Sequence, residues 1–178
     1  MIYLFLANGF EEVEALCPLD LLRRAGLQVM TVGVGGEMIT GSHGISIQAD
    51  IPDTMYRDSK PEMIILPGGM PGSKNLRDNE RVLALVRAMV AENKVTAAIC
   101  AAPIVLEKAG ILKGIRYTMY PGFEAEMSSR PTGNLTEVCG NIITGKGPGA
   151  AFAFAACVAK ALGSDADPMY RDGMFIQG

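Results

Sequence analysis

The fold is decided by one segment, Val95-Thr96-Ala97-Ala98-Ile99-Cys100-Ala101-Ala102-Pro103. Its first five residues are mostly apolar and predict a buried strand, whereas Ala101–Ala109 predicts a helix that closes at Gly110. Only Cys100 is left to form the turn between them. A buried strand that runs straight into a helix is typical of βαβ units. We therefore expect an α/β fold with a mostly parallel central sheet.

The rest of the chain repeats this alternation of strand-like and helix-like stretches. Further strands are expected at Ile2–Ala7, Val29–Val34 and Glu62–Leu66, a hairpin at Met38–Thr40 and Ile45–Gln48, and weaker strands near Tyr117–Met119 and Ile142–Thr144. Helices are expected at Glu11–Ala25, Asn79–Glu92 and Ala150–Leu162. No linker-like stretch divides the sequence, so we predict a single domain over residues 1–178, with the last dozen residues as a surface tail or short cap.

The composition narrows the classes of function. The chain has 178 residues, of which 49% are hydrophobic, and its formal net charge is −3. It has no basic stripe of the kind that nucleic-acid-binding proteins carry. The apolar opening stretch Ile2–Ala7 is too short to span a membrane and lacks a basic leader before it. We therefore expect a soluble, cytoplasmic protein that binds neither nucleic acid nor membranes.

The cysteines and the single histidine are scattered along the sequence. They are Cys17, Cys100, Cys139, Cys157 and His43. No two cysteines form a C-x-x-C pair and there is one histidine, so we expect no metal site. A disulfide framework is not expected in a non-secreted chain of this size, and nothing in the sequence calls for a cofactor. The ordinary role of an isolated cysteine is that of a small buried hydrophobic residue. His43, flanked by glycines in the predicted hairpin, is expected at the surface rather than as a ligand.

The turn at Cys100 favours a chemical role over that ordinary one. Its side chain is expected at the carboxyl edge of the sheet, where open α/β folds bind ligands. The positive end of the following helix would favour the thiolate, and the backbone amide of Ala101 could bind a developing oxyanion. This arrangement is a nucleophile elbow with sulfur in place of a hydroxyl. The alternative is a structural cysteine at the end of a buried strand.

Two other strand ends carry candidate site residues. Gly68 and Gly69 follow the strand at 62–66, and their backbone N–H groups can approach a ligand closely, although an ordinary tight loop is the alternative. Glu14 lies one turn inside the first predicted helix. Facing inward, it would have a raised pKa and could hold a proton near neutral pH. The stretch Gly145-Lys146-Gly147-Pro148-Gly149 fits neither phosphate-loop pattern and is expected to be a turn near the same edge.

Four blocks of sequence together resemble the ThiJ/PfpI superfamily and, within it, the DJ-one branch. They are Gly9-Phe10-Glu11-Glu12-Val13-Glu14, Leu66-Pro67-Gly68-Gly69, Ala98-Ile99-Cys100-Ala101-Ala102-Pro103 and Gly147-Pro148-Gly149. The resemblance covers nearly the whole chain in matching order. It implies a flavodoxin-like three-layer sandwich and a homodimer.

The resemblance also implies roles for particular residues. Cys100 matches the family's oxidation-sensitive nucleophile, and Glu14 matches the carboxylic acid that hydrogen-bonds it. Gly69 and Ala101 match positions whose amides line the oxyanion site. The possible substrate contacts are Tyr120, Gly147 and Pro148, and the expected dimer contacts are Val13, Arg24 and His43.

Two departures from the family pattern bear on the chemistry. The protease-like branches carry a histidine directly after the cysteine, where this chain has Ala101, which argues against peptidase activity. The human branch has a histidine where this chain has Tyr120. Proton transfer is then left to Glu14 or to water, while Tyr120 can donate a hydrogen bond to a bound carbonyl oxygen.

These residues support three hypotheses for function. The leading one is a cofactor-free, cysteine-dependent enzyme that acts on methylglyoxal or glyoxal, as a glyoxalase III does, or on early glycation adducts, as a deglycase does. The second is a non-enzymatic oxidative-stress sensor or chaperone-like protein that works through oxidation of Cys100. The third is a small-molecule-binding domain without catalysis.

Overall fold

A central sheet of seven strands organises the protein. The computed structural model describes residues 1–56 and 61–164. The strands are β1 (Ile2–Ala7), β2 (Val29–Val34), β5 (Ile51–Pro52), β6 (Met63–Leu66), β7 (Val95–Ile99), β8 (Thr136–Cys139) and β9 (Ile142–Gly145), in the order β5-β2-β1-β6-β7-β9-β8. All neighbours pair in parallel except β8, which runs antiparallel to β9. The expected mostly parallel sheet is therefore confirmed.

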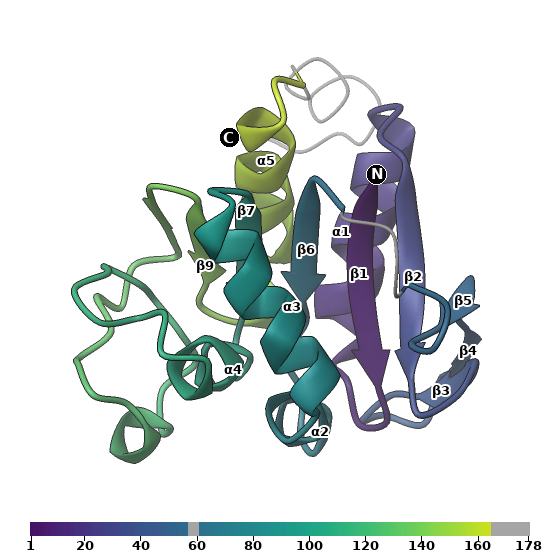
Figure 1. Ribbon diagram of the computed structural model, residues 1–178, viewed down its shortest axis with the longest axis horizontal. Helices are drawn as coiled ribbons and strands as arrows, with labels where there is room; N and C mark the ends of the chain where they lie inside the picture. Colours follow the sequence, from purple (N-terminus) through teal and green to yellow (C-terminus); the bar gives the residue numbers. More distant parts are fainter. Residues whose placement is uncertain (57–60, 165–178) are drawn as a thin grey trace.

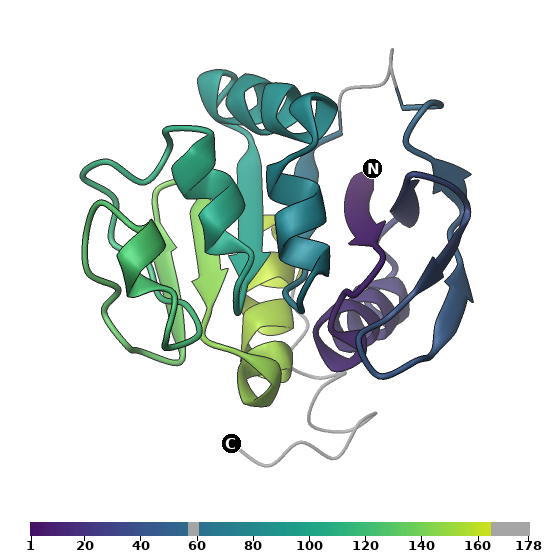
Figure 2. The same cartoon turned by 90° about the horizontal axis from the view of Figure 1, so that it is seen from below.

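Helices cover both faces of this sheet and make a three-layer sandwich (Figure 1). They are α1 (Glu12–Arg24), α2 (Gly72–Arg77), α3 (Glu80–Ala91), α4 (Pro103–Lys108) and α5 (Ala151–Ala161), with 3₁₀ turns η1 (Glu124–Glu126) and η2 (Pro148–Ala150). The view along the strands shows α1 and α5 on one side and α2, α3 and α4 on the other (Figure 2). A separate hairpin of β3 (Met38–Thr40) and β4 (Ser46–Gln48) is confirmed as predicted.

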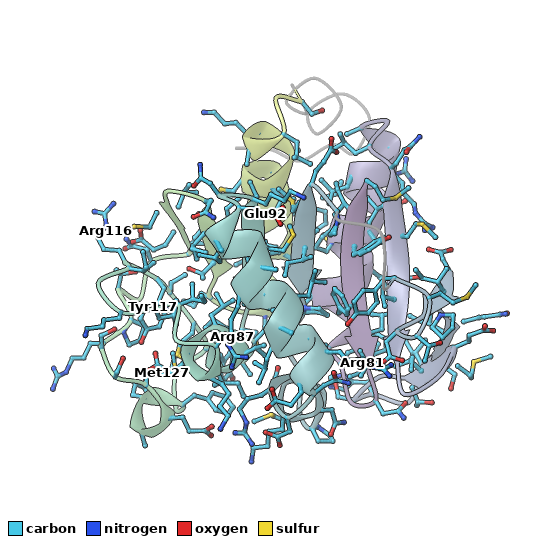
Figure 3. All side chains as sticks on the ribbon, viewed as in Figure 1. Arg81, Arg87, Glu92, Arg116, Tyr117 and Met127 are labelled. Carbon is cyan, nitrogen blue, oxygen red and sulfur yellow. The ribbon has the colours of Figure 1, made fainter. Side chains whose placement is uncertain are left out.

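Two hydrophobic cores result, one under each helical layer. In β1 alternate side chains point to opposite faces, so that Leu4 packs in the core with α1 and α5 while Phe5 packs in the other. Because both faces are covered, the strand is apolar throughout and fully buried. Helix α3 shows the complementary pattern, with an apolar stripe inward and Arg81, Arg87 and Glu92 along its exposed side (Figure 3).

The strand order fixes where a ligand can bind. The parallel strands β2-β1-β6-β7-β9 follow the flavodoxin-like order 2-1-3-4-5 when they are counted along the chain. The direction of winding reverses between β1 and β6, and such a switch point leaves a crevice at the carboxyl ends of the strands. The turns after β1, β6 and β7 therefore meet at one edge of the sheet.

Several sequence-based expectations need correction. The strand expected at Tyr117–Met119 does not form. The N–H of Thr118 donates to Thr144 Oγ1 at 2.9 Å, and both edges of β9 are already occupied, by β7 and β8. Sequence periodicity also missed α2, β5 and β8, which are short. The expected tail over the last dozen residues lies outside the described residues.

Among the described residues, no helix is long and apolar enough to cross a membrane.

Candidate active site

Cys100 forms a strained elbow between β7 and α4. Its φ angle is 63°, in the left-handed region that a residue with a side chain rarely adopts. Two backbone hydrogen bonds fix this geometry. Cys100 N donates to the Gly145 carbonyl at 2.9 Å, and Tyr120 N donates to the Cys100 carbonyl at 2.9 Å. Cys100 is buried and remains 8% exposed. The strained turn agrees with the predicted nucleophile elbow.

Glu14 is buried beside this elbow. It projects from the first turn of α1 and is 0% exposed. One carboxyl oxygen, Oε2, accepts a hydrogen bond from the Gly68 N–H at 3.0 Å, whereas Oε1 is buried and has no hydrogen-bond partner among the described residues. Burial raises the pKa of Glu14 to about 7, against the lowering effect of the Cys100 side chain. The burial and the pKa are those expected of a carboxyl that can hold a proton near neutral pH, and the role of Glu14 stays a prediction.

Gly68 brings these two side chains together because it has no side chain of its own. A Cβ at this position would lie 3.0 Å from Cys100 Sγ and would overlap the Glu14 carboxyl. We expected the Gly68 amide to face a substrate oxyanion, but it donates to Glu14 instead. The backbone amides that bond the sulfur are those of Gly69 and Ala101. The N–H groups of Gly69 and Ala101, and not that of Gly68, are therefore the backbone donors at the sulfur.

The charge state of Cys100 differs from the sequence-based expectation. Burial raises the pKa of the thiol, and the Glu14 carboxylate raises it further, while the Gly69 and Ala101 amides lower it. Helix α4 begins only at Pro103, so its first turn lies beyond the sulfur. A neutral Glu14 removes the repulsion and can donate its proton to sulfur. The pair therefore favours one negative charge over two.

The predicted substrate-contact residues do assemble next to the elbow. Tyr120 is anchored to Cys100 through its backbone N–H and has a 47% exposed side chain. Gly147 packs against its ring, since a Cβ there would lie 3.0 Å from Tyr120 Cδ2. Pro148 begins the 3₁₀ turn that follows. Sequence reasoning missed the role of Gly145, whose carbonyl holds Cys100 N and which left no side-chain signal to find.

The comparison with known families agrees with this geometry. Residues 1–161 match the DJ-1/PfpI family. The chain belongs to this family. Its recognition from the four sequence blocks is therefore confirmed, and a DJ-1/PfpI fold accounts for the flavodoxin-like strand order.

Named relatives of this DJ-1/PfpI chain come from distant organisms. Protein dj-1beta of Drosophila melanogaster is 37% identical over 161 residues, which cover 88% of this chain and 86% of that protein. A deglycase of Pyrococcus horikoshii is 35% identical over 121 residues, covering 68% of this chain and 72% of the relative. The crystal structure of a DJ-1 superfamily protein from Salmonella typhimurium superposes with a TM-score of 0.93 at 32% identity, covering 99% of this chain and 98% of that one.

The residues predicted to form a DJ-1-type dimer contact lie on the surface. Val13 is 49% exposed on α1, and Arg24, near the other end of that helix, pairs with Asp20 at 2.8 Å. His43 is in the turn between β3 and β4 with a 69% exposed side chain. All three residues are therefore accessible to a second copy of the chain, and the dimer contact stays a prediction.

Proposed function

We propose that this DJ-1/PfpI protein is a cofactor-free enzyme that acts on 2-oxoaldehydes such as methylglyoxal and glyoxal, or on their early glycation adducts. Cys100 is the nucleophile and Glu14 carries protons. Relatives named deglycases support a reaction of the deglycase kind, and the site supports the finer assignment to reactive aldehydes. Tyr120 and the Gly147–Pro148 turn would line the entrance for the substrate.

One observation carries the proposal, namely a fully buried carboxyl with a pKa near 7 packed against the cysteine. Near neutral pH, such a group can both donate and accept a proton. Within residues 1–56 and 61–164, Oε1 of Glu14 has no hydrogen-bond partner that would compete, so it is available to the sulfur and to a bound substrate. A cysteine kept only for packing would need neither the strained φ angle nor this carboxyl.

These residues support an internal redox reaction that converts methylglyoxal and water to lactate without an external oxidant or reductant. Cys100 sulfur adds to the aldehyde carbon of methylglyoxal, and the carbonyl oxygen takes up a proton to give a hemithioacetal. Ionised Glu14 then removes the hydrogen on that carbon as a proton and returns it to the neighbouring carbon through an enediol. The former aldehyde carbon is oxidised to a thioester while its neighbour is reduced to an alcohol. Water cleaves the thioester, which releases lactate and restores the thiol.

The Gly69 and Ala101 amides stabilise the oxygen anion during addition. They already bond the sulfur, so an oxygen attached to a carbon on that sulfur would lie within their reach. An aldehyde carried on an amine as an early adduct offers the same carbon to the thiol. In that case the first step releases the amine rather than consuming a free carbonyl.

The first test is lactate formation from methylglyoxal by the purified protein. We expect activity in the wild type, loss of at least about 100-fold in Cys100→Ser and Glu14→Gln, and retention in the control Cys157→Ser, which removes a thiol outside the site. Equal lactate production by wild type and Cys100→Ser would overturn the proposal.

A second measurement separates the two substrate classes. Early adducts release free aldehyde spontaneously, so an enzyme that consumes the aldehyde also depletes the adduct. We would compare the rate of adduct loss with the rate of spontaneous release measured with an aldehyde trap. Adduct loss faster than spontaneous release identifies the adduct as substrate. Loss at the spontaneous rate identifies the free aldehyde.

The second candidate, a redox sensor, is favoured by the same amides and carboxyl. Oxidised to a sulfinate, Cys100 would keep the Gly69 and Ala101 N–H groups as donors and could accept the Glu14 proton. Mass spectrometry after mild peroxide treatment should then show oxidation at Cys100 before Cys17, Cys139 and Cys157. Uniform oxidation of all four cysteines would count against a sensing role.

A further inference from the structure

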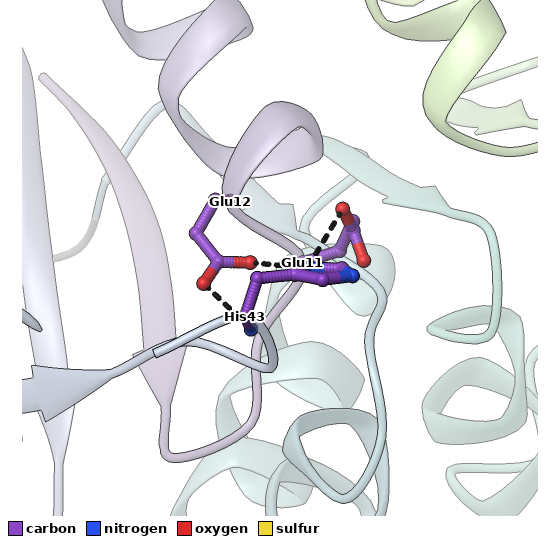
Figure 4. Close-up of side chains that lie close together, drawn as sticks. All are labelled: Glu11, Glu12 and His43. Carbon is purple, nitrogen blue, oxygen red and sulfur yellow. Dashed lines mark hydrogen bonds and ion pairs between the residues drawn. The ribbon is translucent and has the colours of Figure 1, made fainter. Parts of the chain in front are cut away.

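A second group of polar side chains lies at the start of α1 and faces the β3–β4 hairpin (Figure 4). Glu11 is the N-cap residue of α1, Glu12 is the first residue of the helix, and His43 lies in the hairpin turn. Nδ1 of His43 is 3.0 Å from Glu12 Oε2 and 3.6 Å from Glu11 Oε1. One nitrogen or oxygen atom from each residue lies within 4.8 Å of the other two.

The hydroxyl of Ser42 adds a fourth possible donor atom. Its Oγ is 3.2 Å from His43 Nδ1, 3.3 Å from Glu11 Oε2 and 3.4 Å from Glu12 Oε2. Donor atoms bound to one Zn²⁺ at about 2.0–2.2 Å lie about 3.0–3.6 Å from each other, depending on the coordination geometry. His43 Nδ1, Glu12 Oε2 and Ser42 Oγ already have such spacings. Glu11 presents Oε1 to His43 and Oε2 to Ser42, and would turn one of these oxygens toward the ion.

The Glu12 carboxylate is held in place by the backbone of the hairpin. It is 5% exposed, and Oε1 accepts hydrogen bonds from His43 N at 2.8 Å and from Ile45 N at 3.4 Å. Gly41 leaves room for it, because a Cβ there would overlap the carboxylate. Oε2 is thereby turned toward His43 Nδ1. Little further ordering is needed for this oxygen to bind a cation.

Charge gives an independent reason for a cation here. In the described part of the chain, the ion-pair partner shown for Glu11 and Glu12 is His43 alone, so two adjacent carboxylates share one exposed imidazole. A single imidazole carries at most one positive charge, so it cannot balance both carboxylates. A bound divalent cation would balance both.

We propose that Glu11, Glu12 and His43, assisted by Ser42 Oγ, bind a divalent transition-metal ion of the Zn²⁺ class at the junction of α1 and the β3–β4 hairpin. One imidazole nitrogen with carboxylate oxygens is a donor set suited to Zn²⁺, Co²⁺ or Ni²⁺ rather than to Mg²⁺ or Ca²⁺. On binding, the metal replaces any proton on Nδ1, which passes to solvent. The site does not depend on the enzymatic reaction proposed above.

An ordinary ion pair between His43 and Glu12 is the competing explanation, and His43→Arg distinguishes the two. Arginine keeps a positive charge beside Glu12 but offers no lone pair to a metal. The test titrates the full-length protein with Co²⁺, followed by visible absorption, and with Zn²⁺, followed by calorimetry. The Cys100→Ser background removes the thiol of the candidate active site. Glu37→Gln, which neutralises an exposed carboxylate next to β3, is the charge-matched control for Glu11→Gln.

We expect one Co²⁺ or Zn²⁺ per chain, bound equally by the wild type, Cys100→Ser and Glu37→Gln. His43→Arg and Glu11→Gln should weaken binding at least about 100-fold, since loss of a group that merely orients a ligand already costs about 10–100-fold. The melting temperature of metal-free His43→Arg should stay at the wild-type value, which shows an intact fold. Equal binding by wild type and His43→Arg, thiolate-to-cobalt charge-transfer absorption, or no binding at one equivalent would overturn the proposal.

Discussion

Glu14 is a carboxyl group placed where water does not reach, and this makes the stability of the protein depend on pH. Its pKa in the folded protein is about 7, above the value of 4.5 expected for an exposed glutamate. Folding therefore binds a proton in this range, and stability falls as pH rises from about 4.5 to 7. Glu14→Gln keeps the acceptor for Gly68 N–H but cannot ionise. As the pH rises from 4.5 to 8, we expect the free energy of unfolding of Glu14→Gln to increase by about 2–3 kcal/mol relative to that of the wild type.

Urea unfolding of both proteins across this pH range measures the difference, in which the other titrating groups cancel. A difference that stays constant with pH would mean that Glu14 is not ionised against a burial penalty in the folded state.

Gly68 packs against both side chains of the candidate active site. Gly68→Ala adds a Cβ next to Cys100 Sγ and the Glu14 carboxyl, so one of these must shift. We expect a loss of about 1–3 kcal/mol of stability and of most lactate formation. Gly149→Ala is the matched control, because a Cβ there meets nothing within 4 Å. Equal effects of the two substitutions on activity and on urea unfolding would contradict this account.

At the scale of elements, helix α3 begins at a well-defined cap. The Asn79 side chain accepts hydrogen bonds from Arg81 N at 3.0 Å and Val82 N at 3.1 Å. Asn79→Ala leaves both N–H groups without this acceptor and should cost about 1 kcal/mol, whereas Asn79→Asp should retain most of the stability. Urea unfolding checks this, and the rate with methylglyoxal should not change, because Asn79 begins a helix outside the candidate site.

At the scale of the whole molecule, we expect a homodimer through α1 and the β3–β4 hairpin. Val13 on α1 is 49% exposed, and Val138 on β8 is similarly exposed at 50%. Val13→Glu should convert the dimer to a monomer of 18.9 kDa in light scattering, whereas Val138→Glu should leave the dimer intact. A monomeric wild type, or dissociation by Val138→Glu alone, would show that the contact is not where we expect it.

The sequence by itself determined the elements that local patterns encode. Strand β7 has the predicted bounds, because a continuous apolar run flanked by turn residues has few alternatives. The turn at Cys100 was expected from the same segment, although the helix begins at Pro103, two residues later than predicted. Short elements escaped prediction, because a two-residue β5 and a six-residue α2 are too brief to show a period.

The sequence predicted which residues belong to the candidate site better than it predicted which of them contact each other. Glu14 and Cys100 follow strands that are not neighbours, and the intervening β6 places Gly68 between them. The family resemblance supplied this pairing, whereas the residues alone supplied only two turns. The backbone conformation after β6 decides which N–H group points to the sulfur and which points to Glu14. The sequence gives no signal for this conformation, because the residues concerned are glycines.

The residues that surround His43 could be known only from the tertiary structure. In the sequence it is a lone histidine between glycines, and no metal site was expected. The hairpin folds back onto the start of α1 and brings His43 Nδ1 to 3.0 Å from Glu12 Oε2. Local patterns predict how each segment folds, because hydrophobic spacing acts between near neighbours. They do not predict which distant polar groups meet, because that depends on strand order and on the packing of both faces of the sheet.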